Sequence, residues 1–211
     1  MNICYIVCAL DAKIDFFPDE GDLVIAADKG YSTLVKNRVR VDAIIGDFDS
    51  YGKVPDGENV IIYPKEKDDT DSALSIEYAV SKGYKSIYVY GGIGGAIDHT
   101  IANISLIARY AKSGVNVVFV YNDTAIFGLH NGKVVFDEKA SGRISVFSYT
   151  DISHGVTERG LFYSLDNARL ENTVSLGVSN EFVGKESEIS VDDGTLVIVT
   201  SKENYKNHLT K

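Results

Sequence analysis

Four short motifs rich in aspartate and glycine lie in a fixed order in the first half of the chain. They are Ala27-Asp28-Lys29-Gly30, Gly46-Asp47-Phe48-Asp49-Ser50, Lys67-Asp68-Asp69-Thr70-Asp71 and Gly91-Gly92-Ile93-Gly94-Gly95-Ala96-Ile97-Asp98-His99. Carboxylates gathered at one place repel one another at neutral pH unless a cation lies among them. Hard divalent cations prefer oxygen ligands, so Mg²⁺ carrying a nucleotide is the partner that this set favours.

The second motif carries two carboxylates two residues apart, Asp47 and Asp49. In extended backbone this spacing points both side chains to the same side, where they could reach one cation. The alternative is an acidic turn that closes a strand, in which Asp49 or Ser50 caps a backbone amide.

The third motif opens a predicted helix, where carboxylates satisfy free amides and complement the helix dipole. Capping is therefore the structural alternative for Asp68 or Asp69. Asp71 lies within the first turn and could instead face the sheet edge. Lys67 could contact a polyphosphate, or it could be a solvated lysine.

The glycine-rich motif has the order strand, loop, helix that is typical of a phosphate cradle. It lacks the Gly-Lys-Ser/Thr ending of a Walker loop and does not match Gly-x-Gly-x-x-Gly. Asp98 could cap the helix that follows, and His99 could orient Asp98 or simply begin the helix.

Each motif follows an apolar run that reads as a strand, so the four should gather at the carboxyl edge of one sheet. The runs are Leu23 to Ala26, Val41 to Ile45, Asn59 to Ile62 and Ser86 to Tyr90. They alternate with helical runs at Tyr31 to Asn37, Thr70 to Lys82 and Asp98 to Lys112. This alternation predicts an α/β fold with a Rossmann-like, mainly parallel sheet covered by helices.

After Asn122 the helical signal disappears and short strand-like runs follow one another. They are Thr124 to Leu129, Lys133 to Phe136, Arg143 to Tyr149, Gly155 to Glu158, Ser187 to Val191 and Thr195 to Thr200. Turn signals at Asn131-Gly132, Ser141-Gly142 and Asp192-Asp193-Gly194 separate them. We expect a small antiparallel β-sandwich or barrel here, giving two domains, 1–122 and 123–211. The aromatic residues Phe147, Phe162 and Tyr163 are expected in its core.

Composition narrows the function classes. The 211 residues include 21 basic and 30 acidic ones, a net charge of −9 that argues against nucleic acid as a partner. The chain starts with a strand-like run rather than a secretion signal, and no apolar stretch is long enough to span a bilayer, so we expect a cytoplasmic protein.

Cys4 and Cys8 would lie roughly 13 Å apart on one strand, too far for a disulfide, so we expect two reduced core cysteines. The four histidines lack metal-ligand spacing, which disfavours zinc.

Taken together, the motifs resemble the thiamine pyrophosphokinase family. Its pattern Ala-Asp-x-Gly, Gly-Asp-x-Asp-Ser, Asp-x-Thr-Asp and Gly-Gly-x-Gly-Gly-x-x-Asp-His is matched in order and spacing. In the second half, Gly160 to Leu165 and Gly177 to Phe182 resemble the family's thiamine-binding β domain. The resemblance spans nearly the whole chain.

The resemblance implies an activity. Such enzymes move the terminal pyrophosphoryl group of ATP to the hydroxyl of thiamine, releasing AMP and thiamine diphosphate. They typically act as homodimers with sites at the subunit interface. It also implies an ATP-binding and Mg²⁺-binding first domain, with Mn²⁺ as the alternative metal, and a thiamine-binding second domain.

The resemblance also assigns residues. By the resemblance, Asp28, Asp47, Asp49 and Asp71 would hold the metal. The alcohol must also lose a proton as it reacts, and Asp71 or Asp98 are the two candidates for accepting it. We expect the nucleotide to lie against Asp28, Lys29, Gly30, Ser50, Lys67, Asp68, Thr70, Gly92, Gly94, Gly95 and His99, where Lys29 and Lys67 are candidates because of their charge. Ser179, Asn180 and Phe182 would line the thiamine pocket, with the Phe182 ring against the pyrimidine.

The chain departs from the family at two places. Ala96 stands where members often carry an arginine, which removes a guanidinium that could clamp a phosphate. Lys29 stands where many have glycine, and one hypothesis is that it replaces the missing charge. Two other functions stay open: a Mg²⁺-dependent phosphohydrolase on the same carboxylates, and a non-catalytic module that binds nucleotide or thiamine. A thiamine analogue could also be the acceptor.

Overall fold

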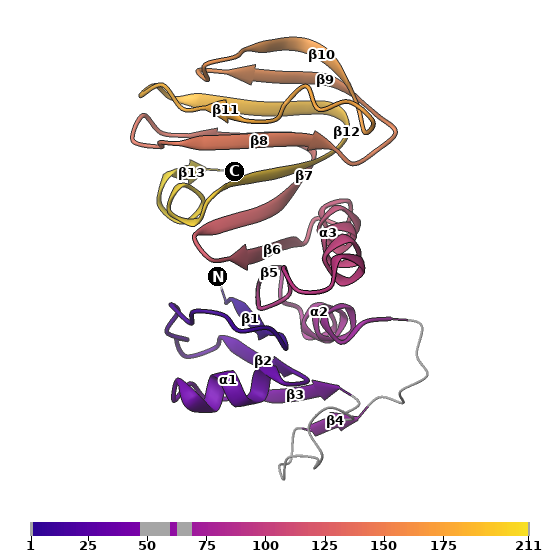
Figure 1. Ribbon diagram of the computed structural model, residues 1–211, viewed down its shortest axis with the longest axis vertical. Coiled ribbons are helices and arrows are strands. Elements are labelled where there is room, and N and C mark those ends of the chain that lie inside the picture. The colour runs from indigo at the N-terminus through magenta and orange to yellow at the C-terminus, as the bar shows by residue number, and fades with distance from the viewer. Residues whose placement is uncertain (1, 47–59, 63–68, 211) are drawn as a thin grey trace. The chain divides into compact units, whose positions relative to one another are not determined.

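The computed structural model describes residues 2–46, 60–62 and 69–210 (Figure 1). Contacts divide the chain into two compact units. The first comprises Met1–Leu106 and Val115–Asn122, and the second comprises Ile107–Gly114 and Asp123–Lys211. In the described part of the chain, no helix has the length and apolar character that crossing a membrane requires.

The first unit is built on a parallel sheet with the strand order β6-β5-β1-β2-β3-β4. The strands are β1 (Cys4–Val7), β2 (Leu23–Ala27), β3 (Ala43–Gly46), β4 (Val60–Ile62), β5 (Ser86–Tyr90) and β6 (Asn116–Tyr121). These strands are apolar on both faces, as parallel strands covered by helices usually are. The mainly parallel α/β class expected from the sequence is confirmed.

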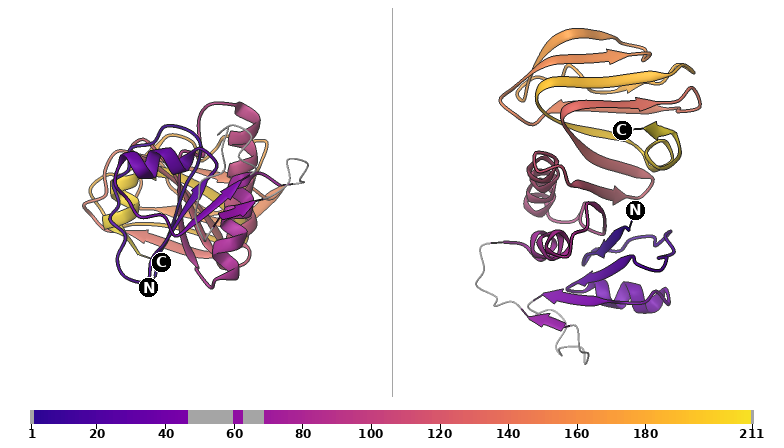
Figure 2. Two further views of the ribbon diagram at one scale, coloured as in Figure 1. Left: turned by 90° about the horizontal axis from the view of Figure 1, so that it is seen from below. Right: turned by 180° about the vertical axis from the view of Figure 1, so that it is seen from behind.

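Three helices accompany these strands: α1 (Gly30–Lys36), α2 (Asp71–Ser81) and α3 (Ile97–Ala111). The fully buried Leu34 of α1 belongs to a core cluster with Val7, Val24 and Ala26 on one face of the sheet. α2 contacts β1, β2, β3 and β5. In Figure 2, α1 and α2 lie on opposite sides of the strands. α1 and α2 therefore cover opposite faces of the parallel sheet.

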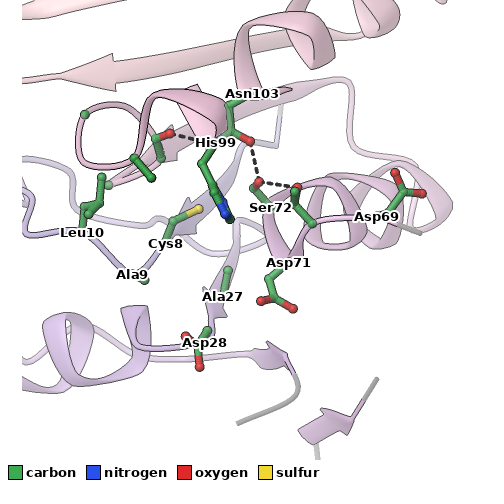
Figure 3. Close-up of a pocket in the computed structure, with 15 residues that line it drawn as sticks. Cys8, Ala9, Leu10, Ala27, Asp28, Asp69, Asp71, Ser72, His99 and Asn103 are labelled. Atoms are coloured by element: carbon green, nitrogen blue, oxygen red, sulfur yellow. Dashed lines mark hydrogen bonds between the residues drawn. The ribbon is translucent and has the colours of Figure 1, made fainter. Parts of the chain in front are cut away.

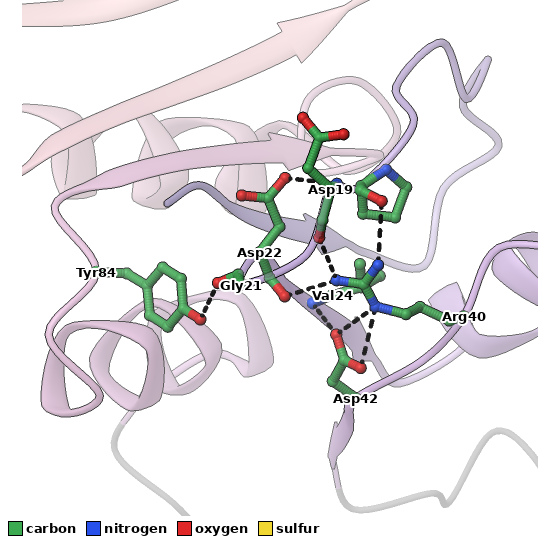
Figure 4. A network of polar contacts seen from close by, with 8 residues as sticks. Asp19, Gly21, Asp22, Val24, Arg40, Asp42 and Tyr84 are labelled. Carbon is green, nitrogen blue, oxygen red and sulfur yellow. Dashed lines mark hydrogen bonds and ion pairs between the residues drawn. The ribbon is translucent and has the colours of Figure 1, made fainter. Parts of the chain in front are cut away.

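The segment before β2 is fixed by one arginine, as Figure 4 shows. Arg40 donates to the carbonyl oxygens of Pro18, Asp19 and Asp22 at 3.1, 3.0 and 2.7 Å. Its Nε lies 3.3 Å from the Asp42 carboxylate, which in turn accepts a 2.8 Å bond from the Val24 backbone N–H. The loop that leads into β2 is thereby tied to the start of β3.

The cysteines agree with the sequence expectation. Cys4 and Cys8 are free and buried. Burial and the nearby Asp71 charge raise the pKa of Cys8 to about 12, and burial raises the pKa of Cys4 as well. Both side chains are therefore neutral thiols in the core.

The second unit is antiparallel. Its strands are β7 (Thr124–Phe136), β8 (Arg143–Ser148), β9 (Ile152–Arg159), β10 (Leu165–Glu171), β11 (Asn180–Glu181), β12 (Ser187–Ser201) and β13 (Leu209–Thr210). β12 pairs with β7 along its length. On its other side it pairs first with β9 and then with β8. The change of neighbour lets one long strand belong to two parts of the antiparallel structure.

Three local expectations for this unit were wrong. Asn131-Gly132 and Asp192-Asp193-Gly194 do not end strands, because β7 and β12 run through them with an irregularity between Val191 and Thr195. There the Asn131 Oδ1 accepts a 2.9 Å bond from the Gly194 N–H, so the irregularity keeps its polar groups paired. The structure also has a short π-helical turn, Asn204–His208, near the end of this unit, where no helix was expected.

The third error concerns the aromatic residues. Phe147, Phe162 and Tyr163 are 39%, 64% and 65% exposed rather than core residues. Phe162 and Tyr163 stack edge to face on each other at 4.8 Å between ring centroids. Strand spacing alone does not tell which face of a strand is covered.

Candidate active site

A pocket of about 540 Å³ opens at the carboxyl edge of the parallel sheet (Figure 3). Its walls come from the residues after β1, β2 and β5 and from the start of α2 and α3. They are Cys8, Ala9, Leu10, Ala27, Asp28, Asp69, Thr70, Asp71, Ser72, Gly91, Gly92, Gly94, Ala96, His99 and Asn103. β1 lies between β2 and β5, so the strand order reverses direction beside it. Such switch points are where open α/β sheets bind ligands.

The first motif turns sharply at the end of β2. Asp28 has a left-handed φ of 48°, and its N–H donates to the Ile45 carbonyl at 2.8 Å. A Cβ on the next glycine, Gly30, would lie 1.8 Å from the Val7 carbonyl oxygen, so only glycine allows α1 to start against β1. The half-buried Asp28 therefore lies in the pocket wall, and Lys29 is exposed beside it.

The third motif starts α2, and Thr70 is its cap. The Thr70 side chain accepts a 3.3 Å bond from the Ala73 N–H, so capping by Asp69 was the wrong alternative. The exposed Asp69 and the half-buried Asp71 both line the pocket. The start of α2 thus adds two carboxylates and the positive end of a helix dipole.

The glycine loop turns through left-handed backbone at Gly91, Gly94 and Gly95, with φ of 67°, 92° and 73°. A Cβ at Gly91 would lie 2.4 Å from the Leu10 carbonyl oxygen, and one at Gly92 would lie 2.7 Å from the Phe119 ring. The Gly94 N–H donates to Thr100 Oγ1 at 3.2 Å. This loop is a close-fitting cradle that side chains would fill.

The helix after the loop carries Asp98 within its first turn, so Asp98 is not its cap. Its Oδ1 accepts a 2.8 Å bond from the His99 N–H, and both residues are exposed. His99 and Ala96 belong to the pocket lining that the described residues form, whereas Asp98 does not. The departure at Ala96 therefore falls in the pocket itself.

Five residues expected in the site lie outside the described residues: Asp47, Asp49, Ser50, Lys67 and Asp68. Among the residues that are described, no group of three or more His, Cys, Asp or Glu side chains is arranged to hold a metal ion. The described carboxylates nearest the pocket are Asp28, Asp69 and Asp71.

Two residues that the sequence analysis did not single out connect the motifs. The buried Ser72 donates to Asn103 Oδ1 at 2.6 Å, and Asn103 Nδ2 donates to the Gly92 carbonyl at 2.6 Å. A signal for Asn103 was present, because it shares a helical spacing with the buried Ile107 and Tyr110. A polar residue on a buried helix face needs a polar partner.

The segment expected to bind thiamine is mostly interior. Asn180 is 3% exposed and Phe182 is 9% exposed, with its ring 5.1 Å from that of Phe136. Ser179 is exposed, has a φ of 60°, and donates its N–H to Ser145 Oγ at 3.0 Å. Of the three, Ser179 alone presents its side chain on the surface of the unit.

Comparisons with known proteins place this geometry in a family. A family model described as thiamin pyrophosphokinase, catalytic domain, matches residues 17–119, and one described as thiamin pyrophosphokinase, vitamin B1 binding domain, matches residues 133–196. Thiamine pyrophosphokinase from Bacillus subtilis is 27% identical over 194 residues, which cover 89% of this chain and 91% of the relative. Thiamin pyrophosphokinase 1 from Caenorhabditis elegans is 26% identical over 173 residues, covering 74% of this chain and 70% of the relative.

Solved structures agree. The crystal structure of thiamine pyrophosphokinase from Bacillus subtilis superposes with a TM-score of 0.83 at 25% identity, covering 95% of this chain and 99% of that one. That of thiamin pyrophosphokinase from Geobacillus thermodenitrificans has a TM-score of 0.80 at 25% identity, covering 95% and 97%. The two family models together span most of the chain, and the chain belongs to the thiamine pyrophosphokinase family.

Proposed function

We propose that this protein transfers the terminal pyrophosphoryl group of ATP to the hydroxyl of thiamine, giving thiamine diphosphate and AMP. The observation that carries the proposal is the pocket at the switch point of the sheet, which Asp28, Asp69 and Asp71 line together with a tight glycine loop. Its relatives are named for the same activity.

The donor set suits a magnesium nucleotide. Three carboxylates and backbone groups line the pocket without a thiolate, since Cys8 is a neutral thiol, and hard oxygen ligands favour Mg²⁺ or Mn²⁺ over zinc. Asp28 and Asp71 would hold the ion together with Asp47 and Asp49. The ion would neutralise the triphosphate, which is most of what phosphoryl transfer requires of a site.

The nucleotide phosphates would lie along the first and fourth motifs. Gly30, Gly92 and Gly95 let the backbone come close, while Lys29, Ser50, Lys67, Asp68, Thr70, Gly94 and His99 would surround the phosphates and their ion. The alcohol of thiamine must lose a proton as it attacks phosphorus, and Asp71 or Asp98 would accept it. The half-buried position of Asp71 in the pocket favours Asp71.

Residues 1–122 would form the ATP-binding domain and residues 123–211 the thiamine-binding domain. Ser179, Asn180 and Phe182 belong to the segment proposed for thiamine. Because Asn180 and Phe182 are buried, they would hold the backbone of that segment in place. The exposed Ser179 would contact thiamine directly. Cationic thiamine suits a chain with a net charge of −9.

The same unit supports a homodimer. Large apolar side chains in residues 162–183 are exposed: Phe162, Tyr163, Val174, Leu176, Val178 and Val183. Exposed apolar side chains of this size are typical of interaction surfaces, and we propose that a second copy of the chain covers them. We further propose a cytoplasmic location, since the reaction consumes ATP.

One experiment tests the function. Purified protein is incubated with ATP, Mg²⁺ and thiamine, and AMP, ADP, inorganic phosphate and thiamine diphosphate are quantified. We expect thiamine-dependent AMP in equal amount to thiamine diphosphate, lost in Asp71→Asn and kept in Glu77→Gln, an exposed position on the same helix. Phosphate release without thiamine would indicate a hydrolase instead, and ATP binding without turnover would indicate a binding module.

A further inference from the structure

A chain of four polar groups runs through the floor of the pocket (Figure 3). Thr70 Oγ1 lies 2.9 Å from Ser72 Oγ, Ser72 Oγ lies 2.6 Å from Asn103 Oδ1, and Asn103 Nδ2 lies 2.6 Å from the Gly92 carbonyl oxygen. Ser72 and Asn103 are 7% and 4% exposed. The contacts are short and largely shielded from water, so each group depends on its neighbour.

The donor and the acceptor of each hydrogen bond in this network follow from the Gly92 carbonyl at its end. A carbonyl only accepts, so Asn103 must present its NH₂ to Gly92 and its oxygen to Ser72. The Ser72 hydroxyl therefore donates its single hydrogen to Asn103 Oδ1, so Thr70 must donate to Ser72. Thr70 Oγ1 keeps a lone pair for the Ala73 N–H, 3.3 Å away, which is the cap of α2.

We propose that Asn103 and Ser72 are positioning residues that hold the start of α2 and the glycine loop in one fixed arrangement. The network joins Thr70, next to Asp71, with Gly92, in the middle of the cradle. One element supplies carboxylates for the metal and the other supplies the backbone around the phosphates. Their relative placement fixes where the triphosphate lies with respect to its ion.

This inference rests on the proposed function for the identity of its ligand, Mg-ATP. It assigns a role to two further residues, Asn103 and Ser72, and neither of them needs to touch a substrate. Reactions that depend on positioning lose rate when a supporting side chain shifts the site, even though no contact to substrate is removed.

The test uses three variants of the full-length protein: Ser72→Ala, Asn103→Leu and the double variant. Mg-ATP affinity is measured by calorimetry, and the Michaelis constants for ATP and thiamine are measured separately. We expect each single variant to weaken Mg-ATP binding about tenfold, with the Michaelis constant for thiamine unchanged. Because both side chains serve one network, the double variant should weaken binding no more than the worse single one.

A fourth variant, Asn103→Asp, tests the direction of the protons. It keeps the shape of the side chain but places a carboxylate oxygen against the Gly92 carbonyl. Protonation would restore a donor, so its Mg-ATP affinity relative to that of the unaltered protein should recover as the pH is lowered. A role in folding alone would lower the melting temperature without producing this recovery at temperatures where the variant is folded.

Two controls match these changes away from the pocket. Ser81→Ala removes a serine hydroxyl that bonds the Tyr78 carbonyl at the exposed end of α2, and Asn37→Asp removes an amide that donates to the Thr33 carbonyl. Both should leave Mg-ATP affinity unchanged. Affinities of Ser72→Ala and Asn103→Leu equal to that of the unaltered protein would overturn the inference. If the unaltered protein binds Mg-ATP but makes no thiamine diphosphate, the proposed function fails, while loss of binding in the variants would still support the positioning role.

Discussion

Asn180 donates a 2.8 Å hydrogen bond to Oε2 of the buried Glu158, and this bond is one of four that saturate the Asn180 amide. The same nitrogen donates to the Tyr163 carbonyl at 2.7 Å, and Oδ1 accepts from the N–H groups of Tyr163 and Glu181, both at 2.9 Å. Asn180 thus ties β9, the segment after it and β11 together. Its amide has no capacity left for a ligand unless one of these bonds breaks.

Glu158 gives the first prediction. It is 1% exposed, its Oε1 has no hydrogen-bond partner among the described residues, and burial raises the pKa of its carboxyl above the ordinary 4.5, opposed only in part by the bond from Asn180. A raised folded-state pKa means that the folded protein binds more protons, so the contribution of Glu158 to stability falls as the pH rises above about 4.5. Glu158→Gln should therefore be more stable than the unaltered protein at pH 8, by a margin that shrinks toward pH 5.

Chemical unfolding at both pH values measures this margin. Glu186→Gln, at an exposed position, serves as the control and should show no such margin. A stability difference between Glu158→Gln and the unaltered protein that stays constant from pH 5 to pH 8 would contradict the raised pKa of the buried Glu158 carboxyl.

Gly91 gives the second prediction. Its φ of +67° and the 2.4 Å approach of a Cβ to the Leu10 carbonyl oxygen make Gly91→Ala doubly unfavourable, whereas Gly114 has a φ of +69° with nothing within 4 Å of its Cβ position. We expect Gly114→Ala to cost about 1 kcal/mol in unfolding free energy from the left-handed backbone alone, and Gly91→Ala to cost more and to abolish ATP binding. Denaturant titration and calorimetry measure the two effects. Equal losses in both variants would show that the cradle is not tightly fitted.

Lys29 gives the third prediction. It is exposed and immediately follows the pocket-lining residue Asp28, and Ala96 lines the pocket where the family resemblance implies an arginine. If Lys29 supplies that charge, Lys29→Ala should raise the Michaelis constant for ATP about tenfold, since hydrogen bonds to charged groups are among the stronger ones. Lys36→Ala, in the last turn of α1, the helix that begins after Lys29, is the matched control. An unchanged Michaelis constant for ATP in Lys29→Ala would contradict this hypothesis.

Arg40 gives the fourth prediction. Its guanidinium contacts three carbonyl oxygens and the Asp42 carboxylate, a geometry that the single ammonium of lysine does not reproduce. Arg40→Lys should lower the unfolding free energy by about 1 to 2 kcal/mol. Arg159→Lys alters an exposed pair with Asp166 and should change it by less than about 0.5 kcal/mol. Similar values for the two variants would mean that the loop before β2 contributes little.

Much of the first unit could be predicted because its signals are local. The run from Ser86 to Tyr90 is a strand at the predicted residues, and α2 and α3 begin within one residue of the expected positions. When each apolar strand is followed by a glycine turn or the start of a helix, few arrangements other than a parallel sheet fit the pattern. The placement of Asp28, Asp71 and the glycine loop at one edge followed from that topology.

The rest depends on contacts between distant residues. Asn131-Gly132 has the sequence of a hairpin turn, yet pairing with β12 keeps β7 continuous through it. The interior positions of Asn180 and Phe182 arise from Glu158, Tyr163 and Phe136, which no local pattern connects to them. The network of Ser72 and Asn103 spans 31 residues of sequence and becomes visible only when the two helices are placed.

Transfer of the intact pyrophosphoryl group is tested by following the γ-phosphorus of ATP. ATP labelled with ³²P at the γ position is supplied with Mg²⁺ and thiamine, and the labelled products are separated. Transfer of the intact pyrophosphoryl group predicts that the label appears in thiamine diphosphate and that the nucleotide product is unlabelled AMP. Label in inorganic phosphate with ADP as the nucleotide product, formed equally without thiamine, would contradict the account.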